Sequence, residues 1–181
     1  MAVIVIGGSG KDVGKTALTC AVIAALRELE WTAVKISGHE YEPGGAVRLL
    51  EEQVCEETRP GNETDTARYL AAGARRALLV MRSEAEIPME EIRRAVGEDR
   101  NVIYESNRIV DVIKADVCLA LMADDAKAKA SFERLLRVAD AVVSVGGMAE
   151  ELPMESRRFR LKSADQLSPE MVKWLRERLS N

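Results

Sequence analysis

The sequence has few of the residues from which metal sites and disulfide frameworks are built. It contains one histidine, His39, which excludes a site with several histidine ligands. Its three cysteines, Cys20, Cys55 and Cys118, lie far apart, and no pair has the spacing of a zinc or redox motif. Reduced thiols are the simplest interpretation of this odd number, so we expect a cytoplasmic protein.

Long apolar runs and a strong charge of either sign are also missing. No segment approaches the roughly 20 apolar residues of a membrane-spanning helix. The N-terminal run at 2–6 is too short for a signal peptide and lacks a basic start. The net charge of -4 gives no reason to expect DNA or RNA as a partner. We therefore expect one domain over 1–181, with neither a nucleic-acid nor a membrane partner.

Short apolar runs alternate with amphipathic stretches along the chain. Strands are expected at 2–6, 32–36, 76–81, 101–105, 116–122, 141–145 and, as an edge strand, 157–162. Helices are expected at about 14–30, 64–73, 88–97, 126–138 and from 168 onward. The stretch 46–54 fits either a strand or a short helix. This alternation predicts an α/β fold, with a mostly parallel sheet of six or seven strands flanked by helices on both faces.

The most specific motif, GGSGKDVGKT, follows the first predicted strand. Its glycines let the backbone direct several N–H groups at one anion, and the helix that follows adds its positive N-terminal end. In the common phosphate-loop spacing the first glycine would stand at position 9, where this chain has Ser9. Gly8 takes that role in a loop that is one residue longer. We expect Lys15 to reach the β- and γ-phosphates, and Thr16 to ligate Mg²⁺.

The whole loop is therefore a candidate nucleotide site. The expected nucleotide-binding residues are Gly8, Ser9, Gly10, Lys11, Asp12, Val13, Gly14, Lys15, Thr16 and Ala17. Lys11 is either a solvated lysine or a phosphate contact. Asp12 either faces the γ-phosphate or is solvated. Lys15 and Asp12 are candidate catalytic residues.

The other site residues are expected at the carboxyl ends of neighbouring parallel strands, where such sheets bind ligands. Glu105 either holds Mg²⁺ or caps the turn after its strand. Lys35 and His39 are candidates for binding an anionic substrate, with a surface lysine and a loop histidine as the alternatives. Asp65 joins the Mg²⁺ site or positions water for catalysis, with capping of its helix as the rival interpretation. Gly146 is a candidate contact for the nucleotide base.

Two stretches resemble known families. The segment DTARYLAAGA, which begins at Asp65, is similar to a motif of molybdopterin-guanine dinucleotide biosynthesis protein B. Lys35 followed by His39 is similar to that family's lysine–histidine element, although three residues intervene here. The loop from Gly8 to Thr16 looks more like that of dethiobiotin synthetase. Both families place a glycine after the strand-end glutamate, whereas Ser-Asn-Arg follows the glutamate here.

The resemblance covers 1–110 and implies a three-layer P-loop NTPase fold. It also implies a Mg²⁺-dependent homodimer that binds a nucleoside triphosphate, GTP or ATP, and hydrolyses it slowly. A protein partner in molybdenum cofactor or related cofactor biosynthesis is expected with it. One alternative is an ATP-dependent ligase or kinase of the dethiobiotin synthetase type that acts on a small anionic substrate. Another is a partner-binding switch controlled by nucleotide.

Overall fold

The computed structural model describes residues 1–38, 47–81, 86–123, 130–146 and 156–180. Its strands are β1 (Ala2–Gly8), β2 (Thr32–Ser37), β3 (Val47–Glu51), β4 (Val54–Glu57), β5 (Arg76–Met81), β6 (Asn101–Glu105), β7 (Val117–Ala123), β8 (Ala141–Val145) and β9 (Arg157–Leu161). Its helices are α1 (Lys15–Ala25), η1 (Arg27–Leu29), α2 (Asp65–Ala72), α3 (Met89–Val96), η2 (Ile109–Asp111), α4 (Ala130–Val138) and α5 (Pro169–Leu179). None of the helices within these ranges is both long and apolar enough to cross a bilayer.

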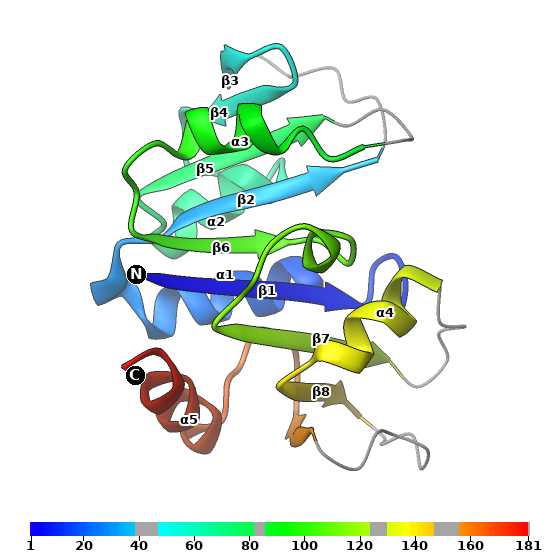
Figure 1. Cartoon of the computed structure of the whole chain (residues 1–181). Coiled ribbons are helices and arrows are strands. Elements are labelled where there is room, and N and C mark those ends of the chain that lie inside the picture. Colours follow the sequence, from blue (N-terminus) through cyan, green and yellow to red (C-terminus); the bar gives the residue numbers. More distant parts are fainter. Residues whose placement is uncertain (39–46, 82–85, 124–129, 147–155, 181) are drawn as a thin grey trace.

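All the strands belong to one sheet with the order β3-β4-β5-β2-β6-β1-β7-β8-β9 (Figure 1). The strands from β5 through β9 in this order are parallel to their neighbours. β4 is antiparallel to both β5 and β3. The α/β class and the mostly parallel sheet are thus confirmed. β9 lies at the edge of the sheet, as its basic side chains predict.

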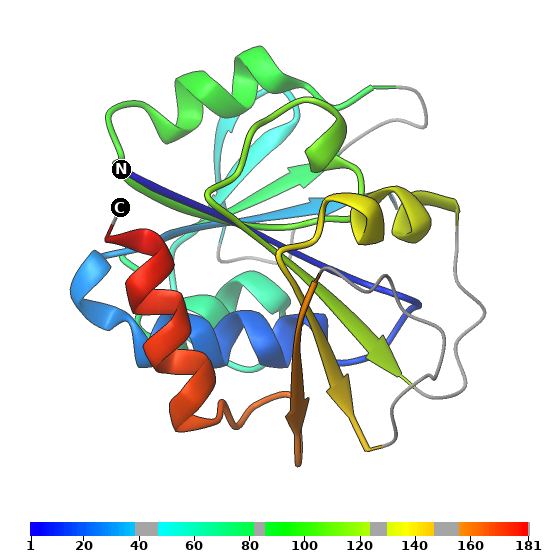
Figure 2. The same ribbon diagram turned by 60° about the horizontal axis from the view of Figure 1, so that its bottom comes forward.

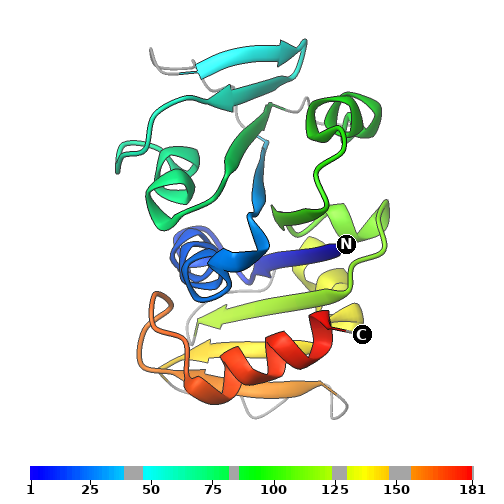
Figure 3. The same cartoon turned by 90° about the vertical axis from the view of Figure 1, so that its left-hand side faces the viewer.

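Helices cover both faces of the sheet. α1, α2 and α5 lie on one face, and α3 and α4 lie on the other (Figures 2 and 3). Alternate residues of β1 face the two sides, because side chains alternate along a strand. Ile4 and Ile6 belong to the core cluster that includes Leu18 of α1, whereas Val5 belongs to the cluster that includes Phe132 of α4. This double cover explains why β1 is apolar along its whole length.

Within the described residues the sheet has nine strands, more than the six or seven predicted. The difference lies at one edge, where the undecided stretch 46–54 contains β3 and the first residue of β4. Glu52 and Gln53 form a turn that folds β3 back on β4. Cys55 is buried in this hairpin while its partner Leu49 is 63% exposed, because β4 lies inside the sheet and β3 forms its edge.

The first helix is shorter than predicted and is followed by a separate turn. α1 ends at Ala25 instead of Glu30, and the 3₁₀ turn η1 completes the segment. The Leu26 carbonyl accepts hydrogen bonds from the Leu29 N–H of that turn, at 3.1 Å, and from the buried Trp31 indole, at 3.0 Å. α4 begins at Ala130, and the predicted helical residues 126–129 lie outside the described residues.

The chain reverses direction across the sheet at β1. From β1 it passes through α1 to β2 on one side, whereas β6 is followed by β7 on the other side of β1. Ligands of open α/β sheets bind outside the carboxyl ends of the strands at such a reversal. The loop between β1 and α1 and the carboxyl ends of β2 and β6 all lie at this end of the sheet (Figure 1).

Candidate functional site

The loop after β1 is wrapped around the stem of Lys15. A Cβ atom on Gly8 would lie 2.8 Å from Lys15 Cγ and 2.7 Å from Val13 Cγ2, closer than side chains tolerate. The Lys15 ammonium donates a hydrogen bond to the Gly10 carbonyl at 2.5 Å. Gly8 therefore stands where the loop needs a residue without a side chain. This geometry supports its assignment as the first glycine of a lengthened loop.

The end of the loop gives α1 an N-terminus that no side chain caps. Gly14 is the N-cap residue and has φ 98, a left-handed conformation that favours glycine. A Cβ atom at this position would also approach Ala164 Cβ at 2.8 Å. Asp12 adopts a left-handed conformation as well, with φ 58. The loop thus directs the positive end of α1 toward the region beyond β1.

Asn107, two residues beyond β6, holds the backbone of the loop. Its amide oxygen accepts a hydrogen bond from the Gly8 N–H at 2.7 Å, and its amide nitrogen donates to the Gly8 carbonyl at 2.9 Å. The close approach depends on Gly7, where a Cβ atom would lie 2.4 Å from the Asn107 oxygen. The start of the loop is thereby tied to the segment that follows Glu105.

Glu105 lies at the centre of the site and is almost fully buried, at 2% exposure. Its Oε2 atom accepts hydrogen bonds from the Thr16 hydroxyl, at 3.0 Å, and from the Tyr69 hydroxyl. Its Oε1 atom accepts from the Lys35 ammonium. Three side chains thus donate to one buried carboxylate. The Mg²⁺ role of Glu105 remains a prediction.

Asp65 joins the same network through Lys35, at a distance of 2.8 Å. Thr64, not Asp65, caps α2, because its side chain accepts a hydrogen bond from the Ala67 N–H. Burial opposes the charged form of Asp65, but the hydrogen bond and charge of Lys35 outweigh it, so the pKa of Asp65 lies below its usual range. Burial likewise opposes the charge of Lys35, but Glu105 and Asp65 outweigh it and raise the pKa of the lysine.

The oxygen atoms at this point suit a hard cation such as Mg²⁺, which prefers oxygen ligands. Thr16 gives its single hydroxyl hydrogen to Glu105, so its lone pairs are the part available to a metal. Glu105 and Asp65 supply negative charge, which Lys35 balances. Within the described ranges no group of three or more histidine, cysteine or acidic side chains has a metal-holding arrangement.

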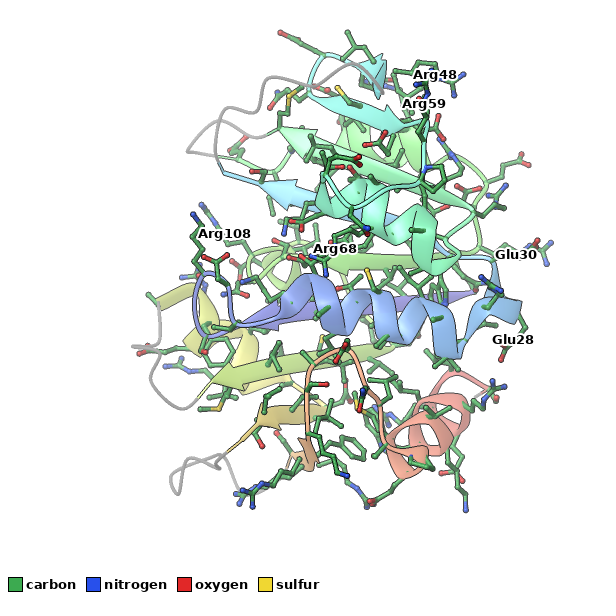
Figure 4. All side chains as sticks on the ribbon, turned by 180° about the vertical axis from the view of Figure 1, so that it is seen from behind. Glu28, Glu30, Arg48, Arg59, Arg68 and Arg108 are labelled. Atoms are coloured by element: carbon green, nitrogen blue, oxygen red, sulfur yellow. The ribbon has the colours of Figure 1, made fainter. Side chains whose placement is uncertain are left out.

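A cavity of about 710 Å³ extends from the loop to the ends of β2 and β6. Five cations line it, Lys11, Lys15, Lys35, Arg68 and Arg108, together with three carboxylates from Asp12, Asp65 and Glu105. This excess of positive charge contrasts with the net charge of -4 for the whole chain. Figure 4 shows Arg68 near the end of α2 that adjoins α1, and Arg108 beyond the loop end of α1. The cavity is therefore suited to an anionic ligand.

Most of the predicted site residues line this cavity, but three of those that the structure describes do not. Ser9 is buried and its backbone N–H donates to the Leu121 carbonyl, so it extends the pairing of β1 with β7. Val13 packs against the core beneath the loop. Gly146 is outside the lining, and its carbonyl accepts a hydrogen bond from Arg160 at 2.6 Å. His39 lies outside the described residues.

Sequence reasoning missed several polar residues of the site, among them Tyr69, Arg68, Asn107 and Arg108. Tyr69 lies four residues after Asp65 on the same helix, so helical spacing was a usable signal for it. Asn107 and Arg108 follow Glu105 at the carboxyl end of β6, where residues of such sheets often bind ligands. The sequence could mark this position as a candidate, but it could not show that Asn107 hydrogen-bonds the loop.

We compared the chain with protein-family models, with curated proteins and with solved structures, and none of the three comparisons gave a match.

Proposed function

We propose that this protein binds a nucleoside triphosphate, GTP or ATP, together with Mg²⁺, and hydrolyses it. The observation that carries the proposal is the meeting of Thr16, at the N-terminus of α1, with the buried carboxylate of Glu105, at 3.0 Å. A phosphate loop needs a hydroxyl and an acidic partner at this point. The positive lining of the cavity supports the same ligand class.

The chain's own residues have separate roles in the proposed reaction. Lys15 and the N-terminus of α1 bind the phosphates and balance the charge that develops on them. Asp12 and Asp65 line the cavity and are the carboxylates available to position the attacking water. Lys35 keeps Asp65 ionised, which makes that residue an acceptor for a water hydrogen. Thr16, with Glu105 behind it and Asp65 beside it, would hold Mg²⁺, which supplies charge stabilisation to the phosphates.

A second candidate is phosphoryl transfer to a small anionic substrate, as in an ATP-dependent ligase or kinase. The continuation of the cavity to Lys35, Ser37 and Arg68 favours it, because these residues belong to β2 and α2 rather than to the loop, and two of them are cations. Hydrolysis that rises several-fold when a substrate is added would distinguish this reaction from slow turnover alone. The placement in molybdenum cofactor or related biosynthesis, the homodimer and the protein partner are proposals that rest on the resemblance of the motifs.

The proposal predicts that Lys15→Ala abolishes stabilisation by nucleotide. A ligand at one hundred times its dissociation constant adds roughly 2.7 kcal/mol of stability, which corresponds to a shift of several degrees in Tm. The measurement is a thermal-shift panel of ATP, GTP and CTP with their diphosphates, with and without Mg²⁺. The panel also identifies the preferred base.

Lys173→Ala is the matched control, since Lys173 lies on α5 with its side chain 78% exposed. This variant should respond to nucleotide as the wild type does. A full nucleotide shift in Lys15→Ala would refute the phosphate-loop assignment.

A further inference from the structure

Tyr69 carries a hydroxyl in a place where packing alone would accept phenylalanine. Its side chain is fully buried in the core cluster between the sheet and the helices α1 and α2. Its hydroxyl donates to Glu105 Oε2, the same oxygen that accepts the hydrogen bond from Thr16. The nucleotide and metal roles proposed above do not use this residue.

The contacts form a chain that runs from the core to the candidate metal position. Tyr69 holds Glu105 Oε2, and Glu105 Oε2 accepts the hydroxyl hydrogen of Thr16. The direction of that hydrogen decides where the lone pairs of Thr16 point. If Glu105 rotated, Thr16 would lose this acceptor and its hydroxyl hydrogen could turn to Asp65, its other hydrogen-bonding neighbour, which would redirect the lone pairs of Thr16.

The other donors to Glu105 are less suited to fix it during a reaction. Lys35 is shared with Asp65, and its side chain is 19% exposed at the cavity. The Thr16 hydroxyl is itself proposed to bind Mg²⁺, so it cannot serve as a fixed anchor for Glu105. Tyr69 is enclosed in the core, and its hydroxyl donates to Glu105 Oε2 from there.

We propose that Tyr69 is a positioning residue for the Mg²⁺ site: through its hydrogen bond it orients Glu105, and through Glu105 it aims the Thr16 hydroxyl at the metal. This inference rests on the proposed nucleotide function and names a residue that the function requires. Groups that orient metal ligands typically change metal affinity or activity roughly 10- to 100-fold when they are removed.

Tyr69→Phe tests the role, because it removes one oxygen atom and keeps the ring packing. The measurement is the Mg²⁺ concentration for half-maximal hydrolysis of ATP and of GTP by the full chain, alongside the nucleotide thermal shift in EDTA. We expect the half-saturating Mg²⁺ concentration to rise roughly 10- to 100-fold. The shift in EDTA should stay at the wild-type value, and excess Mg²⁺ should restore activity.

Tyr104→Phe is the matched control. Tyr104 is also a buried tyrosine, but it lies in the cluster on the opposite face of the sheet, next to Glu105 in the chain. An unchanged Mg²⁺ dependence in Tyr69→Phe, or an equal change in Tyr104→Phe, would overturn the positioning role alone. A wild-type protein without any Mg²⁺-dependent response to nucleotide would overturn the proposed function and the positioning role together.

Discussion

Lys35 forms ion pairs with both Asp65 and Glu105, so its removal is the most informative perturbation of the network. Lys35→Met keeps an unbranched apolar stem and deletes the charge. Glu105 is then left buried with a negative charge, and Asp65 faces it without an intervening cation. We expect the variant to be less stable and to gain a response to divalent cations.

The magnitude follows from the burial of the two ion pairs. Removing one partner of a buried pair costs about 3–5 kcal/mol, whereas an exposed pair contributes about 0–1 kcal/mol. The Glu105 side chain is 1% exposed, but that of Lys35 is 19% and that of Asp65 is 37% exposed. A loss of about 2–4 kcal/mol is therefore expected, or roughly 5–15 °C in Tm for a chain of this size.

The assay is thermal unfolding at several pH values, with and without Mg²⁺ and without nucleotide. The pKa of Asp65 is lowered in the folded protein, so its share of the stability is present at neutral pH and is lost as the pH falls below about 4. The pKa of Lys35 is raised, so its share is complete below about pH 10 and is lost at higher pH. The difference between wild type and variant should accordingly be largest between these limits.

Mg²⁺ should stabilise Lys35→Met more than the wild type, because the cation that joins the two carboxylates is then gone. Arg157→Met is the control, since it breaks an ion pair with Glu170 in which both side chains are more than half exposed. This control should lose no more than about 1 kcal/mol. If Lys35→Met lost no more stability than Arg157→Met and responded to Mg²⁺ as the wild type does, the idea that Lys35 balances a buried carboxylate would be refuted.

Two further substitutions test the acidic partner and the loop. Glu105→Gln should raise the Mg²⁺ requirement of hydrolysis at least about tenfold with a smaller effect on Tm, and an unaltered Mg²⁺ titration would count against Glu105 as the acidic partner. Gly14→Ala should lower Tm and abolish the nucleotide shift, because it combines a left-handed backbone with a 2.8 Å approach to Ala164. Gly97→Ala is its control, because Gly97 also has a positive φ of +62 but an added Cβ atom there would have no neighbour closer than 3.8 Å. If both variants lost the nucleotide response equally, the loop assignment would be contradicted.

Local pattern alone was enough to place the elements that carry the site. Apolar runs and glycine chemistry predicted a strand, a loop and a helix around GGSGKDVGKT, and the structure places β1 and α1 there. The same patterns placed Lys35 and Glu105 near the ends of their strands. These inferences succeed because burial and backbone conformation depend on residues that are close in the chain.

The partners of Glu105 were decided only by the tertiary structure. Thr16, Lys35 and Tyr69 lie 89, 70 and 36 residues away from it in the chain, and they meet because β6 lies between β1 and β2 while α2 packs beside α1. The choice of helix cap was also decided only by the tertiary structure. Thr64 caps α2, and Asp65 pairs with Lys35 instead. The sequence by itself thus determined which residue types stand at the ends of which strands. Strand order and packing determined which of them share hydrogen bonds, because such contacts follow distance in space rather than distance in the chain.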